Sequence, residues 1–421
     1  MGRFLSAADV IATRLPSHVA TSWGDSRPTA VYNDNGSTSK GNRSPLVWAN
    51  VLSGQRLIIG PNFSVAGERS DQALARVPAV IASGAGLCHV WVGLNDIAQN
   101  YPTAATSGAT AAANTIAALE QFRSAGIICV VEAEMGSAGL NAAQVIQVAT
   151  YNAIIYDYCE RSVGVYFHDA RSIVMNPTFS TTLIGGRAGY FYDNPAVHEA
   201  CRAAFYHGRS LAALIQAIVP PRFGVPLIGN VEQFTAGGYQ LVTNPNFNTV
   251  AGGTVGAGIS GNVPAAWIAV CSGGATATLT SQVDPTGNGN SVLAAITFTA
   301  AGETFRLHQS PSVNTWNIGD NLEAAMAIDV TGNPTGLSGT YLELICSTDA
   351  SKTARDCFAV SSNDLGPDIA YSAQLKTRPF TVTGTTKAFL NTSGYVVASG
   401  AGSVNVTFKQ GLIRKRPSAP F

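Results

Sequence analysis

Segments with helical periodicity occupy the first half of the 421-residue chain and stop near residue 220. Before that point, short apolar runs alternate with longer stretches whose apolar residues recur every three or four positions. Beyond about residue 244, the segments are short and alternate apolar with polar residues. One layered core does not accommodate both patterns, and the chain is long for a single core. We therefore expect two domains, residues 1–235 and 236–421.

Four segments of the first half are short and apolar on both faces, as expected for buried parallel strands. They are RLIIGPNFSVA (56–66), GLCHVWVG (86–93), IICVVEAE (127–134) and VGVYFHDA (163–170), and LPSHVA looks like the start of another strand. Helical stretches lie between them. Asn141 is a predicted N-cap, and Asn194 and Pro195 are predicted to cap and begin the last helix. The alternation predicts a doubly wound α/β sheet.

The second half contains no convincing helix. Segments such as ATATLTSQV, VLAAITFTA, TYLELICS and SVNVTFKQG have the two-residue period of strands with one buried face. Clusters of Gly, Asn, Pro and Ser separate them, as turns would. This pattern predicts an antiparallel β-sandwich.

Composition excludes several classes of protein. Apolar residues make up 46% of the chain and charged residues only 12%, which argues against disorder. The formal net charge is zero, so nucleic acid is not an expected partner. No apolar run reaches the roughly 18 residues that span a bilayer, and Asp9 and Arg14 interrupt the N-terminal apolar stretch, unlike a signal peptide. The cysteines form no metal-binding motif, so neither a metal nor another cofactor is expected.

Short polar motifs follow the predicted strands of the first half. They are Gly24-Asp25-Ser26 after the first strand, Gly67 after the second, Gly93-Leu94-Asn95-Asp96 after the third, and Asp193 and His198 near the start of the last helix. The carboxyl ends of parallel strands share one edge of the sheet, where open α/β folds bind ligands. A polar turn is the simplest interpretation of each motif alone. Together they indicate a site with a serine nucleophile.

These motifs, in this order, resemble those of the SGNH (GDSL-type) hydrolases, a family of serine esterases and lipases with a flavodoxin-like fold. The resemblance covers about residues 15–220. It implies that Ser26 attacks an ester carbonyl and that His198 takes the serine proton. It also implies an oxyanion hole made by the backbone N–H groups of Ser26 and Gly67 and the side-chain amide of Asn95.

One position departs from the family pattern. In the family an acid stands three residues before the histidine, and Pro195 occupies that place here. The nearest preceding acid is Asp193, five residues before His198. Either Asp193 still orients the imidazole, which we favour, or a backbone carbonyl does so and the site is a Ser-His dyad.

Other polar residues near the motifs are expected to have structural roles. Asp25 and Asp96 are predicted to shape turns. Arg27 and Arg69 are predicted to pack, with contact to an acidic substrate as the alternative. Glu132 and Glu134 end a predicted strand, and lining the cleft is the alternative to a structural role for them. The histidines expected to be packing or surface residues are His18, His89, His168 and His207.

The second half resembles, more weakly, the jelly-roll carbohydrate-binding modules that accompany glycan-active enzymes. The stretch that carries this resemblance is LVTNPNFNTVAGGTVGAGISGNVPAAWIA. The aromatic candidates for stacking on sugars are Trp267, Trp316, Tyr341, Tyr371 and Tyr395, although core packing is the favoured role for each. Assembly, as in phage tail proteins, is an equally good use for such a sandwich, and a homo-oligomer is possible.

The resulting hypothesis is a serine esterase that removes O-acyl groups, most simply acetyl, from a carbohydrate. The alternatives are a lipase, thioesterase or aryl esterase whose sandwich is structural, and a non-catalytic virion or adhesion protein. A glycan substrate implies an extracellular or virion-associated location.

Overall fold

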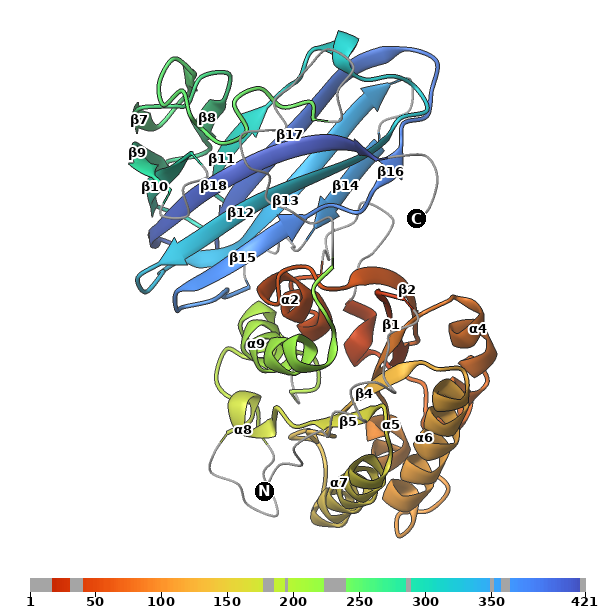
Figure 1. Ribbon diagram of the computed structural model, residues 1–421. Coiled ribbons are helices and arrows are strands. Elements are labelled where there is room, and N and C mark those ends of the chain that lie inside the picture. Colours follow the sequence, from red (N-terminus) through yellow and green to blue (C-terminus); the bar gives the residue numbers. More distant parts are fainter. Residues whose placement is uncertain are drawn as a thin grey trace. The chain divides into compact units, whose positions relative to one another are not determined.

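The computed structural model describes residues 17–30, 41–176, 185–193, 196–222, 240–284, 289–348, 352–356 and 364–416. The chain divides into two compact units (Figure 1). The first comprises Met1–Tyr32 and Arg43–Arg222, and the second comprises Asn33–Asn42 and Phe223–Phe421. The boundary predicted between residues 235 and 236 lies outside the described residues.

A five-stranded parallel sheet forms the centre of the first unit. Its strands lie in the order β2-β1-β3-β4-β5 and every neighbouring pair is parallel. The strands are β1 (Val19–Gly24), β2 (Ile58–Ser64), β3 (Leu87–Trp91), β4 (Ile128–Glu132) and β5 (Val165–His168). Every residue of β3 and β4 is buried, which explains their continuous apolar sequence. The predicted doubly wound sheet is confirmed.

Helices cover both faces of this sheet. They are α2 (Pro45–Leu52), α3 (Ser70–Leu74), α4 (Val77–Ala82), α5 (Leu94–Ala98), α6 (Ser107–Ser124), α7 (Ala142–Arg161), α8 (Arg171–Val174) and α9 (Cys201–Ile218), with a 3-10 turn, η1, at Arg27–Ala30. Figure 1 shows α2 and α9 on one side of the sheet and α6 and α7 on the other. None of the described helices is both long and apolar enough to cross a membrane.

The termini of α7 and α9 test two predictions made from capping residues. The side chain of Asn141 accepts from the backbone N–H of Gln144, as predicted for an N-cap, and the Gln144 side chain completes a capping box. The prediction that the last helix begins at Pro195 is wrong. The helix α9 begins at Cys201, and residues 196–200 are not helical; Asn194 and Pro195 lie outside the described residues.

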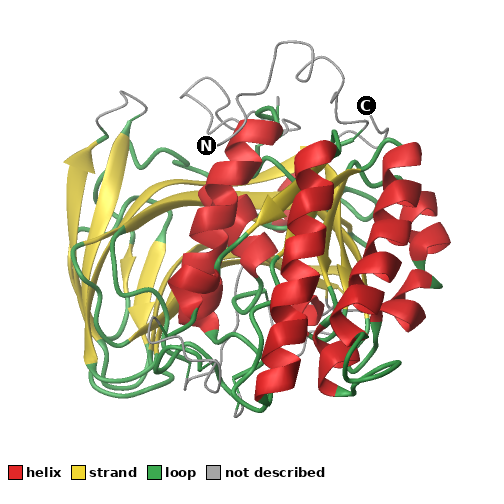
Figure 2. Ribbon diagram, turned by 90° about the horizontal axis from the view of Figure 1, so that it is seen from below, coloured by secondary structure: helices red, strands yellow, loops and turns green. Residues whose placement is uncertain are grey.

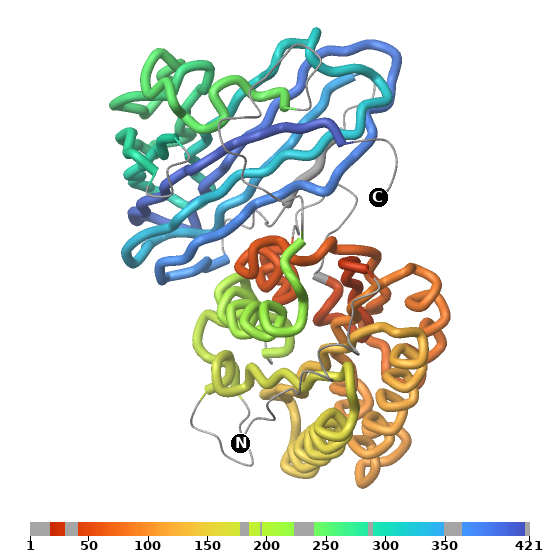
Figure 3. The backbone as a smooth tube through the Cα atoms, viewed as in Figure 1, coloured from red at the N-terminus to blue at the C-terminus, as the bar shows by residue number. Residues whose placement is uncertain are grey.

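The second unit is a β-sandwich, as predicted. In Figure 2 it consists of strands and loops, and the tube of Figure 3 follows it from green to blue. One sheet has the order β15-β12-β18-β10-β9-β7 with β16 paired to β12, and the other has the order β14-β13-β17-β11-β8-β6. The strands are β6 (Thr254–Val255), β7 (Ile259–Gly261), β8 (Ile268–Cys271), β9 (Thr276–Val283), β10 (Asn290–Phe298), β11 (Thr304–Gln309), β12 (Asn321–Thr331), β13 (Leu337–Thr348), β14 (Lys352–Asp356), β15 (Tyr371–Lys376), β16 (Phe380–Thr381), β17 (Lys387–Ala398) and β18 (Gly402–Arg416).

Most aromatic residues considered for sugar stacking belong to the core of this sandwich. Trp267 and Trp316 are fully buried, and Tyr341 and Tyr371 are buried as well. Tyr395 is half-buried and stacks on Tyr341, with ring centroids 4.4 Å apart. Four of the five aromatic candidates therefore pack in the core, which is the role that the sequence analysis favoured.

Gly208 lies where α9 packs tightly against α2. A Cβ atom at this position would lie 2.4 Å from the Cβ of Trp48 and 2.7 Å from the carbonyl oxygen of Pro45. Helix propensity alone predicts that Gly208→Ala stabilises the protein by about 1 kcal/mol. We expect the reverse, a loss of about 1–3 kcal/mol from overpacking, measurable by urea unfolding.

Gly185→Ala is the matched control, because a Cβ there meets nothing within 4 Å. It should change the free energy of unfolding by less than about 0.5 kcal/mol. Stabilisation by Gly208→Ala would show that the two helices are not packed as described.

Candidate active site

Ser26 lies in the turn that follows β1, and neighbouring strands hold this turn. Gly24 ends the strand, and a Cβ on it would lie 2.0 Å from the carbonyl oxygen of Trp91 on β3. The N–H of Asp25 donates to that same oxygen at 3.2 Å, and the carbonyl of Gly24 accepts from the N–H of Val65 after β2. The turn therefore needs glycine at residue 24 for close approach, and it presents Ser26 at the carboxyl edge of the sheet.

His198 lies on a short hairpin rather than on a helix. Phe191 pairs with Glu199 in antiparallel fashion, and the N–H of Tyr192 donates to the carbonyl of His198 at 3.2 Å. The carboxylate of Asp193 closes the turn, with Oδ1 accepting from the N–H of Val197 at 3.0 Å and of His198 at 2.9 Å. The carbonyl of His198 and the N–H of Ala200 pair with Tyr192 and Tyr190 instead of forming helical bonds, which explains the late start of α9.

The hairpin joins the predicted acid, base and nucleophile into one chain of hydrogen bonds. Asp193 Oδ2 lies 2.5 Å from His198 Nδ1, and His198 Nε2 lies 2.7 Å from Ser26 Oγ. The five-residue spacing therefore does not prevent contact between acid and base. Burial alone would raise the pKa of Asp193, but the hydrogen bonds from His198 and Val197 lower it below its usual value. Asp193 is thus held as a carboxylate.

The predicted oxyanion donors lie on the loops after β2 and β3. Gly67 has a φ of +81° and is exposed, so glycine suits the left-handed backbone there. Asn95 lies in the first turn of α5, and its amide donates to the carbonyl of Glu68 at 2.8 Å. Among the described residues, the N–H groups of Ser26 and Gly67 have no recorded acceptor. Two backbone donors and the second amide hydrogen of Asn95 remain for a ligand oxygen.

Asp96 holds these two loops together. It is fully buried, and its carboxylate accepts from the N–H of Ser70 at 2.9 Å and from the hydroxyl of Ser70 at 2.7 Å. Burial raises the pKa of Asp96, against the effect of these bonds. The residue therefore links the start of α3 to α5 and is structural, as the sequence predicted.

A buried ionic cluster lies directly beside Ser26. Arg27 donates to both oxygens of Asp25 and to both oxygens of Glu134, over 2.5–3.0 Å, and its guanidinium lies 4.8 Å from the ring centroid of Trp91. Burial alone would lower the pKa of Arg27, but the two carboxylates raise it above its ordinary value. Burial also raises the pKa of Glu134, against the opposing effect of Arg27. Arg27 is thus a packing residue, and Glu134 does not line an open cleft.

Two groups of residues near the site were not predicted from the sequence. Tyr192 is 51% exposed and stacks on His198, with centroids 5.7 Å apart, while the guanidinium of Arg43 lies 4.0 Å from the Tyr192 centroid. The other group is the buried set of Glu132, His89, His168, His207 and Glu199 behind His198. The only sequence signal for the first group is the aromatic run beside Asp193.

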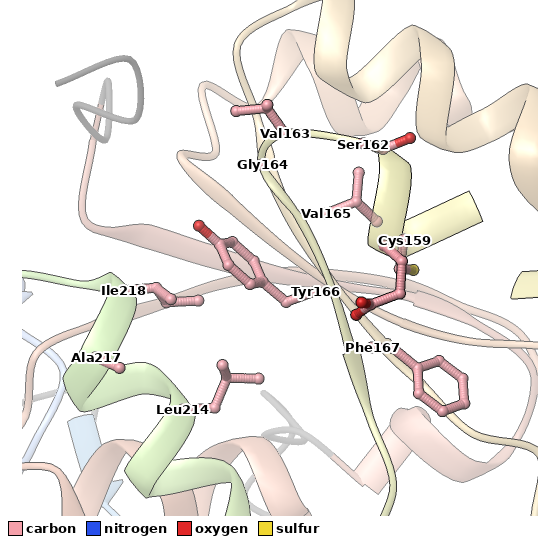
Figure 4. Close-up of a pocket in the computed structure, with 11 residues that line it drawn as sticks. Cys159, Ser162, Val163, Gly164, Val165, Tyr166, Phe167, Leu214, Ala217 and Ile218 are labelled. Atoms are coloured by element: carbon pink, nitrogen blue, oxygen red, sulfur yellow. The ribbon is translucent and has the colours of Figure 1, made fainter. Parts of the chain in front are cut away.

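The pocket of Figure 4 is separate from Ser26. It is lined by the carboxyl-terminal turns of α7 and α9 and by the start of β5, including Cys159, Tyr166, Leu214 and Ile218. The sheet is parallel, so the start of β5 belongs to the edge opposite the one where Ser26 lies. We assign this pocket no part in the chemistry of Ser26.

Replacing Arg27 by methionine should test the ionic cluster. Removing one partner of a buried ion pair leaves uncompensated charge and typically costs about 3–5 kcal/mol. In Arg27→Met the pKa of Glu134 should rise further, so the destabilisation should be largest near neutral pH and shrink as falling pH neutralises the carboxyl group. Urea unfolding of both proteins at several pH values measures this difference.

Arg161→Met is the control, because the Arg161–Asp157 pair is exposed and lies on one helix. Its effect should stay below about 1 kcal/mol. A pH-independent loss in Arg27→Met would mean that packing, rather than charge pairing, is what this arginine provides.

Comparison with known proteins gives one sequence family and several distant structures. Residues 23–198 match the GDSL-like Lipase/Acylhydrolase family. No curated protein is similar enough to count as a match. The esterase EstA from Pseudoalteromonas sp., inhibited by monoethylphosphonate, is 14% identical with a TM-score of 0.36, over 48% of this chain and 98% of its own.

Two further solved structures are similar at the same distant level. A GDSL-like lipase from Bacteroides thetaiotaomicron VPI-5482 is 17% identical with a TM-score of 0.34, over 50% of this chain and 94% of its own. The enzymatically active domain of bacteriophage CBA120 tailspike protein 4 is 10% identical with a TM-score of 0.28, over 42% of this chain and 22% of its own. Such distant similarities carry no argument about substrate.

The family match spans the turn of Ser26, both loops that carry Gly67 and Asn95, and the hairpin as far as His198. It includes the end of β1, the strands β2 to β5 and the helices α2 to α8, and it ends before α9. Residues 23–198 therefore form a domain of the GDSL-like lipase/acylhydrolase family, with the SGNH hydrolase fold.

Proposed function

We propose that this protein is a serine esterase that removes short O-acyl groups, most simply acetyl, from a carbohydrate. The observation that carries the esterase part is the hydrogen-bonded chain from Asp193 through His198 to Ser26, at 2.5 Å and 2.7 Å. A serine hydroxyl is a poor nucleophile until a positioned base accepts its proton. The fixed carboxylate of Asp193 supports the tautomer that leaves His198 Nε2 free to accept it.

In the proposed reaction, Ser26 Oγ bonds to the ester carbonyl carbon while its proton passes to His198 Nε2. The negative oxygen of the tetrahedral intermediate takes hydrogen bonds from the N–H groups of Ser26 and Gly67 and from Asn95. The carbon–oxygen bond to the alcohol then breaks, and the alcohol leaves with the proton from His198. Water attacks the acyl-enzyme in the same way, giving the free acid and restoring the serine.

The rim of the site favours a polar substrate over a long acyl chain. On one side Arg43 lies over Tyr192, whose ring covers His198. Arg69, which follows Gly67 by two residues in the chain, lies 4.0 Å from the ring centroid of Tyr101. Aromatic rings with arginines over them offer hydrogen bonds and flat surfaces that suit a hydroxyl-rich alcohol. We further propose action outside a cell or on a virion, where such glycans occur.

The substrate part of the proposal is tested with the full chain and two series of esters. One is a panel of acetylated polysaccharides assayed for acetate release, and the other is a set of p-nitrophenyl esters of increasing acyl length. We expect acetate release and a rate that falls sharply beyond short acyl groups. A preference for long acyl chains or thioesters would favour a lipase or thioesterase, and no turnover of any ester would favour a non-catalytic protein.

Ser26→Ala should abolish ester hydrolysis and leave the melting temperature unchanged, because only the nucleophilic oxygen is lost. A fluorophosphonate probe should label the wild type once per chain and fail to label the variant. Ser124→Ala, at an exposed serine of α6, should keep the full rate. More than about a tenth of the wild-type rate in Ser26→Ala would exclude this serine as the nucleophile, since loss of the nucleophile costs about 10⁶-fold in a serine protease.

Asp193→Asn distinguishes a triad from a dyad. In a serine triad, the same change of the orienting carboxylate lowers kcat by about 10⁴-fold. We expect a loss of at least about 10²-fold here, measured as kcat on p-nitrophenyl acetate. Asp157→Asn, on the exposed end of α7, is the control and should keep the wild-type kcat. A loss within about threefold would mean that the backbone alone orients His198.

A further inference from the structure

The side chain of Glu199, the residue after His198 on the hairpin, points into the protein interior. Neighbouring side chains of an extended strand point to opposite faces. His198 faces Ser26 with 29% of its side chain exposed, whereas the side chain of Glu199 is 2% exposed. The residue after the proposed base is therefore a buried carboxylate, and its charge requires a partner.

That partner is His207 on α9. Its Nδ1 lies 2.9 Å from Glu199 Oε1, and its Nε2 lies 2.9 Å from Oε2 of Glu132, the last residue of β4. The side chains of His207 and Glu132 are completely buried. The contact with Glu199 is a hydrogen bond, whereas the contact with Glu132 is an ion pair by distance without hydrogen-bond geometry. Two flanking carboxylates favour a ring that carries both protons. The geometry points to an imidazolium that bridges β4 to the hairpin.

Two further histidines complete the environment of Glu132. His89 Nε2 lies 2.8 Å from Oε1, and His168 Nδ1 lies 2.8 Å from Oε2. The other nitrogen of His168 lies 3.1 Å from the hydroxyl of Ser210. Both oxygens of Glu132 are thus paired, as a buried carboxylate requires.

The pKa values agree with this charge assignment. Burial alone would lower the pKa of His207, but Glu132 and Glu199 raise it to about 10. Burial would raise the pKa of Glu132, but His168 and His207 hold it well below its usual value. The imidazolium and the Glu132 carboxylate therefore persist across the neutral range.

A metal ion is the alternative occupant of this cluster. The ligand atoms of Glu132, His168 and His207 lie within 4.8 Å of one another. However, the Glu132 oxygen lies only 2.8 Å and 2.9 Å from the two ring nitrogens. Two tetrahedral ligands at zinc distances are about 3.4 Å apart, so the observed spacing fits direct contacts between the side chains instead.

We propose that His207 is a positioning residue, which fixes the hairpin and thereby His198 by bridging Glu132 and Glu199. The inference rests on the proposed esterase function for its kinetic test. Asp193 bonds both the hairpin turn and the ring of His198. On the opposite face of the same segment, Glu199 contacts His207, which in turn contacts Glu132 of the sheet. A second contact with α9 comes from Tyr190 and Tyr206, whose rings stack with centroids 5.9 Å apart.

The test compares three variants of the full chain. His207→Gln keeps a polar donor group but removes the positive charge and the two separate donor atoms that the ring places against the two carboxylates. Glu199→Gln keeps the shape and removes the charge that faces His207. We expect each to lower kcat at least about tenfold with little change in KM, because small displacements of a catalytic group cost up to about 100-fold. The double variant should be no slower than the worse single variant.

His89→Gln is the matched control. His89 also bonds Glu132 and is equally buried, but it has no recorded contact with Glu199 or with the hairpin among the described residues. It should lower the melting temperature by a similar amount and keep kcat within about twofold of wild type. A fall in kcat equal to that of His207→Gln at equal melting temperature would overturn the proposal, because the cluster would then act only through stability.

A second readout does not depend on activity. The His198 Nδ1 proton, in its short bond to Asp193, should give a far-downfield NMR signal in the wild type and in His89→Gln. We expect this signal to broaden or vanish in Glu199→Gln and His207→Gln. Its retention in both folded variants would overturn the proposal, and so would one equivalent of bound metal in the purified protein. If the wild type hydrolyses no ester, the function fails while this readout still decides the positioning role.

Discussion

The carboxylate of Asp193 makes two kinds of bond at once, and the geometry of the site depends on both. Its Oδ1 accepts backbone N–H groups and closes the hairpin, while its Oδ2 accepts from the imidazole of His198. A carboxylate that bonded only the imidazole ring would leave the backbone N–H groups of the turn without this acceptor, and the turn could open. Because the same side chain shapes the turn and orients the ring, a spacing of five residues places acid and base in direct contact.

Two buried ionic groups lie near the edge of the sheet that carries Ser26, and both contact Trp91. Arg27, with Asp25 and Glu134, has its guanidinium 4.8 Å from the Trp91 centroid, and the ring of His207 lies 5.3 Å from it, edge to face. Taking such charges out of water offsets much of their attraction, so they contribute little net stability. Their effect is to hold segments of the site in place. Arg27 connects the turn of Asp25 to Glu134, just after β4, and His207 connects the hairpin to Glu132, the last residue of β4.

The sequence predicted the parts of this protein that depend on local periodicity. Continuous apolar runs indicated β3 and β4, alternating runs indicated the sandwich, and motif order indicated which residues lie at the strand ends. The start of α9 was predicted wrongly, because the backbone of His198 and Ala200 pairs with Tyr192 and Tyr190 instead of continuing a helix. The cluster around Glu132 could not be predicted, since register brings it together: Glu132 pairs with His168 across two strands, and Glu199 and His207 arrive from elsewhere.

The acid and the base lie on the same short hairpin, so movement of the hairpin affects both of them. Acid and base belong to one turn of eleven residues or so, from Tyr190 to Ala200, whose ends are joined by a 2.7 Å backbone bond. The same aspartate closes the turn and contacts the ring, so a change in the turn reaches the acid and the base together. A movement of this segment away from the sheet would lengthen the distance from His198 to Ser26 and would also loosen the turn that holds the ring. Whatever fastens the segment to the sheet therefore acts on the whole acid–base pair.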